Sequence, residues 1–393
     1  MAQRIMNHAR EELDRLLSEP VESARARGLS TFDELAGDAP IVIFGAGGLG
    51  RMTAAGLVAE GRPAVAFADN APSLAGTRVA GIPVFSAADA VARYGRDGIF
   101  VVAVWRNPAT ELMSDRMERL RALGAKRVTS FATLFWKYPN RFLPYYSIDL
   151  PHRVLEAKDV VLRAFEMLAD ERSRQEYVAH LRLRLALDFG GLLPPVTMPE
   201  HFDQTIYRLS NEERFIDCGA FDGDTVRTFL NLVPDFTGCV RAYEPDRANF
   251  ARLETWRRQL NPAVRDRIEA YCAGVGARRT KAVFNESGGT GSAIGTGTTE
   301  IDIVALDEEV ADLRPTLIKA DTEGYEPEVV AGSRGIISSL APVLALCVYH
   351  RQDHPWRLPL MAAALHDGYR YFLRSYALDG WELVLYAVPA HRN

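Results

Sequence analysis

Three aspartates surround a pair of glycines in the stretch FIDCGAFDGDT, residues 215–225. Asp217, Asp222 and Asp224 would repel a pyrophosphate, because like charges at short range are energetically costly. The same acids would attract a cation, and S-adenosylmethionine carries a sulfonium and an ammonium against a single carboxylate. This ligand also needs glycines where the backbone approaches it closely. The loop therefore predicts a binding site for S-adenosylmethionine.

A further acid stands where the ribose of that cofactor would lie. Glu244 is at the end of the next expected strand, 239–245, about 20 residues beyond the glycine loop, and an acid at this spacing binds ribose hydroxyls. Taken alone, Glu244 could equally be an ordinary solvated strand end, but the paired spacing favours the cofactor. The predicted cofactor-binding residues are Asp217, Gly219, Ala220, Phe221, Gly223, Asp224, Glu244, Pro245, Cys272 and Ala273.

A second glycine loop, FGAGGLG, has the opposite character, because it contains no acid. Gly45, Gly47 and Gly50 match G-x-G-x-x-G between an apolar strand and the start of a helix, and Asp69 ends the following strand. A helix N-terminus without nearby acids suits a phosphate. The loop predicts a second nucleotide in the N-terminal domain. The alternative is a degenerate domain in which the glycines only permit a tight turn.

Three candidate catalytic residues end two later strands. Asp321 and Glu323 follow the strand 316–321, and His350 ends the strand 342–350. Methyl transfer requires positioning and removal of a hydroxyl proton, and His350 has the best unperturbed pKa for a base at neutral pH. Asp321 is the rival base or a contact of the methionine end of the cofactor, and Glu323 could orient the acceptor hydroxyl. The alternative role for His350 is to cap its strand.

No metal site is predicted, because two carboxylates without a clear third ligand are more often hydrogen-bonded structure. The acceptor pocket could be lined by residues that follow the same strands, namely Tyr325, Arg351, His354 and Trp356. Partly buried packing explains these four equally well. The glycine-rich stretch 286–295 could be a flap over the cofactor or simply a flexible hairpin tip.

The elements that must position these residues form two α/β series. Strands alternating with helices predict two Rossmann-like, doubly wound domains. The expected strands of the first lie within 39–50, 64–70, 81–86 and 98–105, and those of the second within 214–219, 239–245, 268–275, 316–321, 342–350, 369–376 and 381–389. The last two suggest an antiparallel hairpin on an otherwise parallel sheet. A further hairpin is expected over 281–306.

The segment between the two series has apolar residues at three- and four-residue steps over 152–189, which predicts helices. We therefore expect an N-terminal domain over 1–150, a helical linker over 151–200 and a C-terminal domain over 201–393. A length of 393 residues suits two domains.

Composition limits the possible partners. The net charge of −5 argues against a nucleic-acid binder. The start of the sequence lacks the apolar core of a signal peptide, and the most apolar later stretch, 340–348, is too short to span a bilayer. The scattered cysteines, Cys218, Cys239, Cys272 and Cys347, predict buried reduced thiols. These features indicate a soluble cytoplasmic protein whose oligomeric state the sequence leaves open.

Residues 200–393 resemble the FkbM-type family of S-adenosylmethionine-dependent methyltransferases. The resemblance rests on FIDCGAFDGDT and, in family order, on AYEPDRANF (242–250), GGTGSAI (288–294), IKADTEGYEPEVVAG (318–332) and VYHRQDHPWRLPL (348–360). It implies a class I methyltransferase fold whose seven-stranded sheet has an antiparallel last strand. It also implies O-methylation of a hydroxyl, commonly on a sugar or polyketide-derived acceptor. The N-terminal domain resembles one that is fused to some bacterial members.

Two other functions remain open on the sequence. One is a nucleotide- or sugar-nucleotide-binding protein with an inactive methyltransferase-like half, and the other is a nicotinamide-dependent oxidoreductase centred on the first glycine loop. Asp217 and Glu244 favour the methyltransferase. The stretch 101–108 supplies no identifiable proton relay, which argues against the oxidoreductase.

Overall fold

The structure, a computed structural model, describes residues 2–105, 111–285, 293–294 and 297–392. The chain divides into two compact units. The first comprises residues 1–158, 178–195 and 377–381, and the second comprises residues 159–177, 196–376 and 382–393. Residues of the expected linker, 151–200, therefore contribute to both units, and the units do not follow the expected boundaries at 150 and 200. Among the described residues, no helix has the length and apolarity needed to cross a bilayer.

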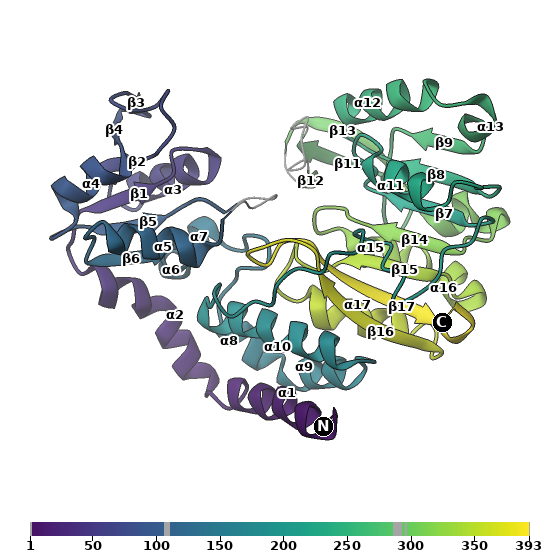
Figure 1. The fold of residues 1–393 in the computed structure, drawn as a ribbon, viewed down its shortest axis with the longest axis horizontal. Helices are drawn as coiled ribbons and strands as arrows, with labels where there is room; N and C mark the ends of the chain where they lie inside the picture. Colours follow the sequence, from purple (N-terminus) through teal and green to yellow (C-terminus); the bar gives the residue numbers. More distant parts are fainter. Residues whose placement is uncertain (1, 106–110, 286–292, 295–296, 393) are drawn as a thin grey trace. The chain divides into compact units, whose positions relative to one another are not determined.

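The first unit contains a six-stranded sheet in the order β3-β4-β2-β1-β5-β6 (Figure 1). Its strands are β1 (Ile41–Phe44), β2 (Ala66–Ala68), β3 (Arg78–Val79), β4 (Ile82–Phe85), β5 (Ile99–Val102) and β6 (Arg127–Ser130). All neighbours are parallel except β3 and β4. Four of these strands lie where the sequence predicts strands, and β3 and β6 were not predicted. The strands β1 and β5 are buried along their whole length, as is typical of central parallel strands.

The helices of this unit precede and connect the strands. They are α1 (Ala2–Leu16), α2 (Val21–Ala36), α3 (Gly48–Ala59), α4 (Ala87–Tyr94), α5 (Met113–Ala122), α6 (Phe131–Lys137), α7 (Pro139–Phe142) and α8 (His152–Glu156). Helix α3 packs tightly on the loop after β1, because a Cβ at Gly50 would lie 1.8 Å from the carbonyl oxygen of Gly45.

The second unit is built on a seven-stranded sheet in the order β16-β17-β15-β14-β7-β8-β9 (Figure 1). Its strands are β7 (Arg214–Cys218), β8 (Cys239–Tyr243), β9 (Ile268–Tyr271), β14 (Leu317–Ala320), β15 (Val343–Cys347), β16 (Tyr369–Ser375) and β17 (Leu383–Pro389). Only β17 runs antiparallel to its neighbours, β15 and β16. The predicted class I methyltransferase fold with an antiparallel last strand is confirmed.

The predicted strand 268–275 is divided between two sheets. Its first half is β9 of the large sheet, and its second half is β10 (Gly274–Val275) of a four-stranded sheet with β11 (Thr280–Asn285), β12 (Ala293–Ile294) and β13 (Thr299–Val304). The antiparallel pair of β11 and β13 confirms the expected hairpin. Most of its glycine-rich tip, including 286–292, lies outside the described residues, and so does the proposed flap.

Helices precede and connect the strands of the second unit. They are α9 (Lys158–Glu166), α10 (Glu171–Ala186), α11 (Asp224–Leu232), α12 (Arg247–Arg258), α13 (Pro262–Arg265), α14 (Leu306–Glu309), α15 (Glu326–Ala331), α16 (Arg334–Leu340) and α17 (His354–Ala363), with 3₁₀ turns at Ala311–Leu313 and Ala390–Arg392. The unit boundary falls inside α10, after Tyr177, and α9 begins at the boundary of the first unit.

The strand order determines where chemistry can occur. The crossover direction reverses between β7 and β14, and ligands of open α/β sheets bind beyond the carboxyl ends of strands at such a point. The carboxyl ends of β7, β8, β14 and β15 share this edge, and the antiparallel β17 begins there. Residues just after the first four strands and just before β17 are therefore brought together.

Candidate active site

The loop after β7 requires its glycines. Gly219 has a φ of +79°, and a Cβ there would lie 1.8 Å from the carbonyl oxygen of Asp321. Gly223 caps the start of α11 with a φ of +90°, where a Cβ would approach Leu253 and Trp256. Both residues are in the left-handed region that glycine tolerates without strain. The loop is thus pressed against the end of β14.

Glu244 is buried directly behind this loop. The backbone N–H of Phe221 donates to its Oε2 at 2.8 Å, and the N–H of Asp246 donates to its Oε1 at 2.8 Å. Burial raises the pKa of Glu244 to about 7, although the hydrogen bonds from Asp246 and Phe221 oppose the shift. The carboxylate therefore holds the glycine loop from the neighbouring strand, and its contact with a ribose stays a prediction.

The first aspartate of the loop forms a buried ion pair. Asp217 is fully buried, and its Oδ1 lies 3.0 Å from Nζ of Lys319 on β14. Lys319 also donates to the carbonyl oxygen of Gly219 at 2.6 Å. Burial raises the pKa of Asp217 to about 6, and Lys319 counteracts this shift. Sequence reasoning missed Lys319, although a lysine inside the apolar run TLIKAD is a usable signal.

The other loop aspartates are in different surroundings. Asp222 pairs with Arg227 of α11, so its charge is partly neutralised. Oδ1 of Asp224 accepts a hydrogen bond from the N–H of Thr225 at 2.7 Å. The acids of the loop are therefore not three equivalent negative charges. The remaining predicted cofactor residues are the buried Ala220 and Ala273, the half-buried Phe221 and Pro245 and the exposed Cys272.

The exposure of Cys272 corrects the prediction that the four cysteines are buried. All four cysteines are free, and Cys218 and Cys347 are buried as expected. Cys239 is only half-buried and Cys272 is exposed. Cys272 immediately follows β9, which is an edge strand of the large sheet. Because β9 has a neighbouring strand on one side only, the residue after it is less covered.

His350 lies between the carboxylates of Glu326 and Asp321. Its Nδ1 lies 2.8 Å from Oε1 of Glu326, and its Nε2 lies 3.3 Å from Oδ1 of Asp321. Burial lowers the pKa of His350, but the carboxylates of Glu326, Glu323 and Asp321 outweigh it and raise the pKa to about 10. The ring is therefore an imidazolium at neutral pH, and its side chain is only 1% exposed.

Glu326, the first residue of α15, organises this part of the site. Its Oε1 accepts hydrogen bonds from the N–H of Thr322 at 2.8 Å and from His350, and its Oε2 lies 3.2 Å from Nδ1 of His354. Burial opposes its ionisation, but His350 and His354 hold the pKa of Glu326 well below its usual range. The sequence pattern predicts no role for Glu326.

Asp321 and Glu323 are more accessible than His350. Their side chains are 28% and 21% exposed. The Tyr349 hydroxyl donates to Oδ1 of Asp321 at 3.4 Å. Burial raises the pKa of Glu323 to about 7, with His350 opposing the shift. Of the three predicted catalytic residues, these two carboxyls are the ones that an acceptor can reach.

A second acidic cluster adjoins Asp321. Glu200 precedes β7, and Glu382 directly precedes β17; their carboxyl groups are hydrogen-bonded to each other. Burial and then the neighbouring Glu382 raise the pKa of Glu200 well above its usual range. His201 and the thiol of Cys347 lie beside Glu200. None of these four residues was predicted as part of a site.

Among the described residues, three groups could each offer three metal ligands with atoms within 4.8 Å of one another. They are Glu200, His201 and Cys347; Asp321, Cys347 and Glu382; and Asp321, Glu326 and His350. The third group is the least suited to a metal, because an imidazolium has no free lone pair on its ring nitrogens.

The residues expected around an acceptor are not equally accessible. His354 and Trp356, on α17, are 1% and 4% exposed, and their packing roles match the alternative interpretation. Tyr325 is half-buried, and Arg351 is exposed. The Arg351 guanidinium lies beside Gly324, where a Cβ would come within 2.8 Å of its Nε.

The first glycine loop, in the other unit, has a similar local design. Asp69 follows β2, and its carboxylate accepts hydrogen bonds from the N–H groups of Ala46 and Ala71, both at 2.8 Å. Gly45 has a φ of +105°. A Cβ at Gly47 would meet no atom within 4 Å. The space next to Gly47, at the start of α3, is therefore open.

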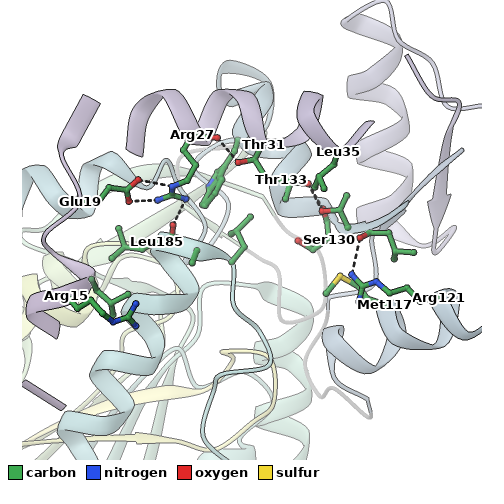
Figure 2. A pocket seen from close by; sticks show the side chains of 16 residues that line it. Arg15, Glu19, Arg27, Thr31, Leu35, Met117, Arg121, Ser130, Thr133 and Leu185 are labelled. Atoms are coloured by element: carbon green, nitrogen blue, oxygen red, sulfur yellow. Dashed lines mark hydrogen bonds and ion pairs between the residues drawn. The ribbon is translucent and has the colours of Figure 1, made fainter. Parts of the chain in front are cut away.

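A cavity of about 640 Å³ in the first unit lies apart from this loop (Figure 2). It is lined by residues of α1, α2, α5, β6 and α6 and of the end of α10, and none of the predicted site residues lines it. Its Arg27 is bonded to Glu19 and to the carbonyl oxygen of Leu185, and its Arg121 to Glu118. These guanidinium groups are already engaged within the unit, and we assign the cavity no function.

Comparison with known proteins agrees with the second unit's fold. Residues 217–377 match the family model described as "Methyltransferase FkbM domain". Among the curated proteins, none matches this sequence.

Among solved structures, the chain is similar to methyltransferase FkbM from Methylobacillus flagellatus KT. The TM-score is 0.76 at 21% identity, over 98% of this chain and 100% of that one. A putative rRNA-methylase from Clostridium thermocellum matches with a TM-score of 0.34 at 9% identity, over 49% of this chain and 97% of that one. Aeropyrum pernix fibrillarin, solved with natively bound S-adenosyl-L-methionine, matches with a TM-score of 0.30 at 16% identity, over 46% of this chain and 69% of that one.

Proposed function

We propose that this chain, whose residues 217–377 form a methyltransferase FkbM domain, transfers a methyl group from S-adenosylmethionine to a hydroxyl oxygen. The observation that carries the proposal is the arrangement at the edge of the seven-stranded sheet. There the glycine loop and the buried Glu244 lie on one side of the switch point, and Asp321 and His350 lie on the other.

The residues fit the cofactor in shape and charge. Gly219 and Gly223 hold the loop in conformations that only glycine adopts without strain, and Glu244 offers a carboxylate for the ribose hydroxyls. Asp224 and Asp321 add negative charge suited to a cationic ligand, whereas the charge of the buried Asp217 is paired with Lys319. S-adenosylmethionine supplies the methyl group when it is bound.

Replacing Glu244 tests this site. Glu244→Ala is expected to weaken S-adenosylhomocysteine binding by roughly 1.5–3 kcal/mol, the worth of hydrogen bonds to a charged group. Isothermal titration calorimetry measures the change, and a thermal melt checks that the variant is folded. Glu269→Ala is the matched control, because Glu269 is an exposed acid on the adjacent strand β9. Equal affinities of a folded Glu244→Ala protein and the wild type would reject the ribose contact.

Asp321 is the proton acceptor in this proposal. The acceptor oxygen must lose its proton as it attacks the methyl carbon, and Asp321 has an accessible carboxylate at the correct edge. His350, already protonated and buried, orients Asp321 through the 3.3 Å contact and balances its charge. Glu323 accepts a second hydrogen bond from the substrate. The favoured acceptor is a sugar or glycoside, since adjacent hydroxyls suit neighbouring carboxylates.

A second ligand is proposed for the first unit. The open face of Gly47 and the placement of Asp69 favour a phosphate-bearing nucleotide at the start of α3. A nucleotide bound here could be the part of a sugar nucleotide that carries the sugar to be methylated. The loop can therefore be explained without a nicotinamide-dependent oxidoreductase or an inactive nucleotide-binding protein.

The full-length protein provides the test of this second site. A thermal melt with NAD, NADP and sugar nucleotides is expected to shift upward for at least one of them, since binding to the folded state raises apparent stability. Gly47→Val should abolish that shift while remaining folded, because its side chain would enter open space. Glu244→Ala should retain the shift. If no nucleotide of the panel shifts the melting temperature, the second site is rejected and the loop is a purely structural turn.

A further inference from the structure

The acidic cluster beside the proposed catalytic carboxylate has the composition of a metal site. Glu200 and His201 lie in the segment that leads to β7, Cys347 is the last residue of β15, and Glu382 directly precedes β17. Because β17 is antiparallel, its start lies at the same edge as the end of β15. The topology thus brings together four side chains that are distant in sequence.

The ligand atoms converge closely. Glu200, His201 and Cys347 offer one oxygen, one nitrogen and one sulfur within 4.8 Å of one another, and Glu382 offers an oxygen equally close to Cys347. Nε2 of His201 lies 3.5 Å from Oε1 of Glu200. Ligands about 2.0–2.2 Å from one tetrahedral zinc ion lie roughly 3.3–3.6 Å apart. The 3.5 Å between Nε2 of His201 and Oε1 of Glu200 falls in this range. The two atoms could therefore bind the same ion.

An independent observation points to an absent ligand. His201 is 5% exposed, and the nitrogen that faces Glu200 is its Nε2. The atom opposite, Oε1 of Glu200, is buried and accepts no hydrogen bond in the part of the chain that the structure describes. Unsatisfied buried polar atoms are uncommon and call for a partner such as an ion.

The nearby basic group does not neutralise this cluster. Lys319 is committed to Asp217 at 3.0 Å and to the carbonyl oxygen of Gly219 at 2.6 Å. Glu200 and Glu382 are instead bonded to each other, an arrangement that requires a shared proton or a cation. Burial raises the pKa of Glu382, and the other nearby cation, His350, opposes this shift from a distance but is itself bonded to Glu326.

We propose that Glu200, His201, Cys347 and Glu382 bind a divalent transition-metal ion, with zinc as the best match. A mixture of imidazole, thiolate and carboxylate ligands selects zinc-like ions over Mg²⁺ or Ca²⁺, which prefer oxygen ligands alone. Glu200, His201 and Cys347 form the group whose ligand atoms lie within 4.8 Å of one another, and Glu382, which is close to Cys347, would supply the fourth ligand once the ion is bound. Such closed four-ligand sites are structural. The ion would fasten β15, β17 and the segment before β7 to one another beside Asp321.

Cobalt provides a spectroscopic test that does not depend on methyl transfer. The full-length protein is stripped of metal with a chelator and titrated with Co²⁺, then with Zn²⁺ in competition. The expected result is one Co²⁺ per chain with a near-ultraviolet thiolate-to-cobalt charge-transfer band, which Zn²⁺ displaces. Cys347→Ser should lose the band, and His201→Gln and Glu382→Gln should lower Zn²⁺ affinity by roughly tenfold or more.

Cys218→Ser is the matched control, because Cys218 is an equally buried thiol at the end of β7 outside the cluster. It should retain the band and the affinity. The proposal is overturned if the wild type binds neither ion at micromolar concentration, or if the band survives Cys347→Ser. A folded wild type that binds Zn²⁺ but not S-adenosylhomocysteine would support the metal site and reject the proposed function, so the two failures are distinguishable.

Discussion

Replacing Asp321 with asparagine is expected to lower turnover by roughly 10²–10⁴-fold, the usual contribution of a positioned proton acceptor. Affinity for S-adenosylhomocysteine should stay nearly unchanged, because the substitution keeps the shape of the side chain. Turnover is measured as S-adenosylhomocysteine release with a panel of simple glycosides as acceptors. Asp353→Asn is the control, since Asp353 is an exposed acid that precedes α17 and pairs with Arg357.

The pH profile distinguishes Asp321 from His350. With a pKa of about 10, His350 is neutral in only a small fraction of molecules at pH 7. A mechanism through neutral His350 would make the rate climb about tenfold per pH unit up to pH ~10. If His350 is not the acceptor, this climb should be absent between about pH 7 and 9. A steep climb over that range, or a fully active Asp321→Asn enzyme, would return the role to His350.

Replacing Lys319 with methionine is expected to be the most destabilising of these changes. Removing one partner of a buried ion pair leaves the other charge uncompensated and lowers the free energy of unfolding by roughly 3–5 kcal/mol. Here Asp217 would remain fully buried without its partner, and the carbonyl oxygen of Gly219 would lose its donor. Urea denaturation followed by circular dichroism measures the loss.

Two further variants make this test specific. Lys281→Met removes an ion pair with Glu300 in which both side chains are 64% exposed, and it should leave stability unchanged within error. Lys319→Met combined with Asp217→Asn should recover part of the loss, because no buried charge is then left alone. If Lys319→Met is as stable as Lys281→Met, the pair does not support the glycine loop.

Sequence reasoning located the residues that follow strands, because periodicity and strand-end spacing are local properties. The loop with Gly219 and Gly223, the acid Glu244 and the strands of the large sheet were all accessible in this way. The strand β6 was missed, because its four residues, RVTS, include two hydroxyl side chains and lack a clear apolar pattern.

Long-range partners could not be predicted from local patterns. Glu326 reaches His350 because the turn before α15 has Glu323 and Gly324 at φ values of +52° and +99°. The pairing of Lys319 with Asp217 depends on the parallel register of β14 and β7, which places the two residues side by side. The raised pKa of His350 follows from three carboxylates of the segment 321–326, which is distant from His350 in sequence. A sequence-based choice of base therefore had to rely on unperturbed pKa values.

A crystal structure with S-adenosylhomocysteine tests the central claim most directly. The account predicts one molecule at the carboxyl end of β7, with its ribose hydroxyls within hydrogen-bond distance of Glu244 and its sulfur directed toward Asp321. Density for the molecule in the Gly45–Gly50 loop instead, or a ribose that makes no contact with Glu244, would contradict it.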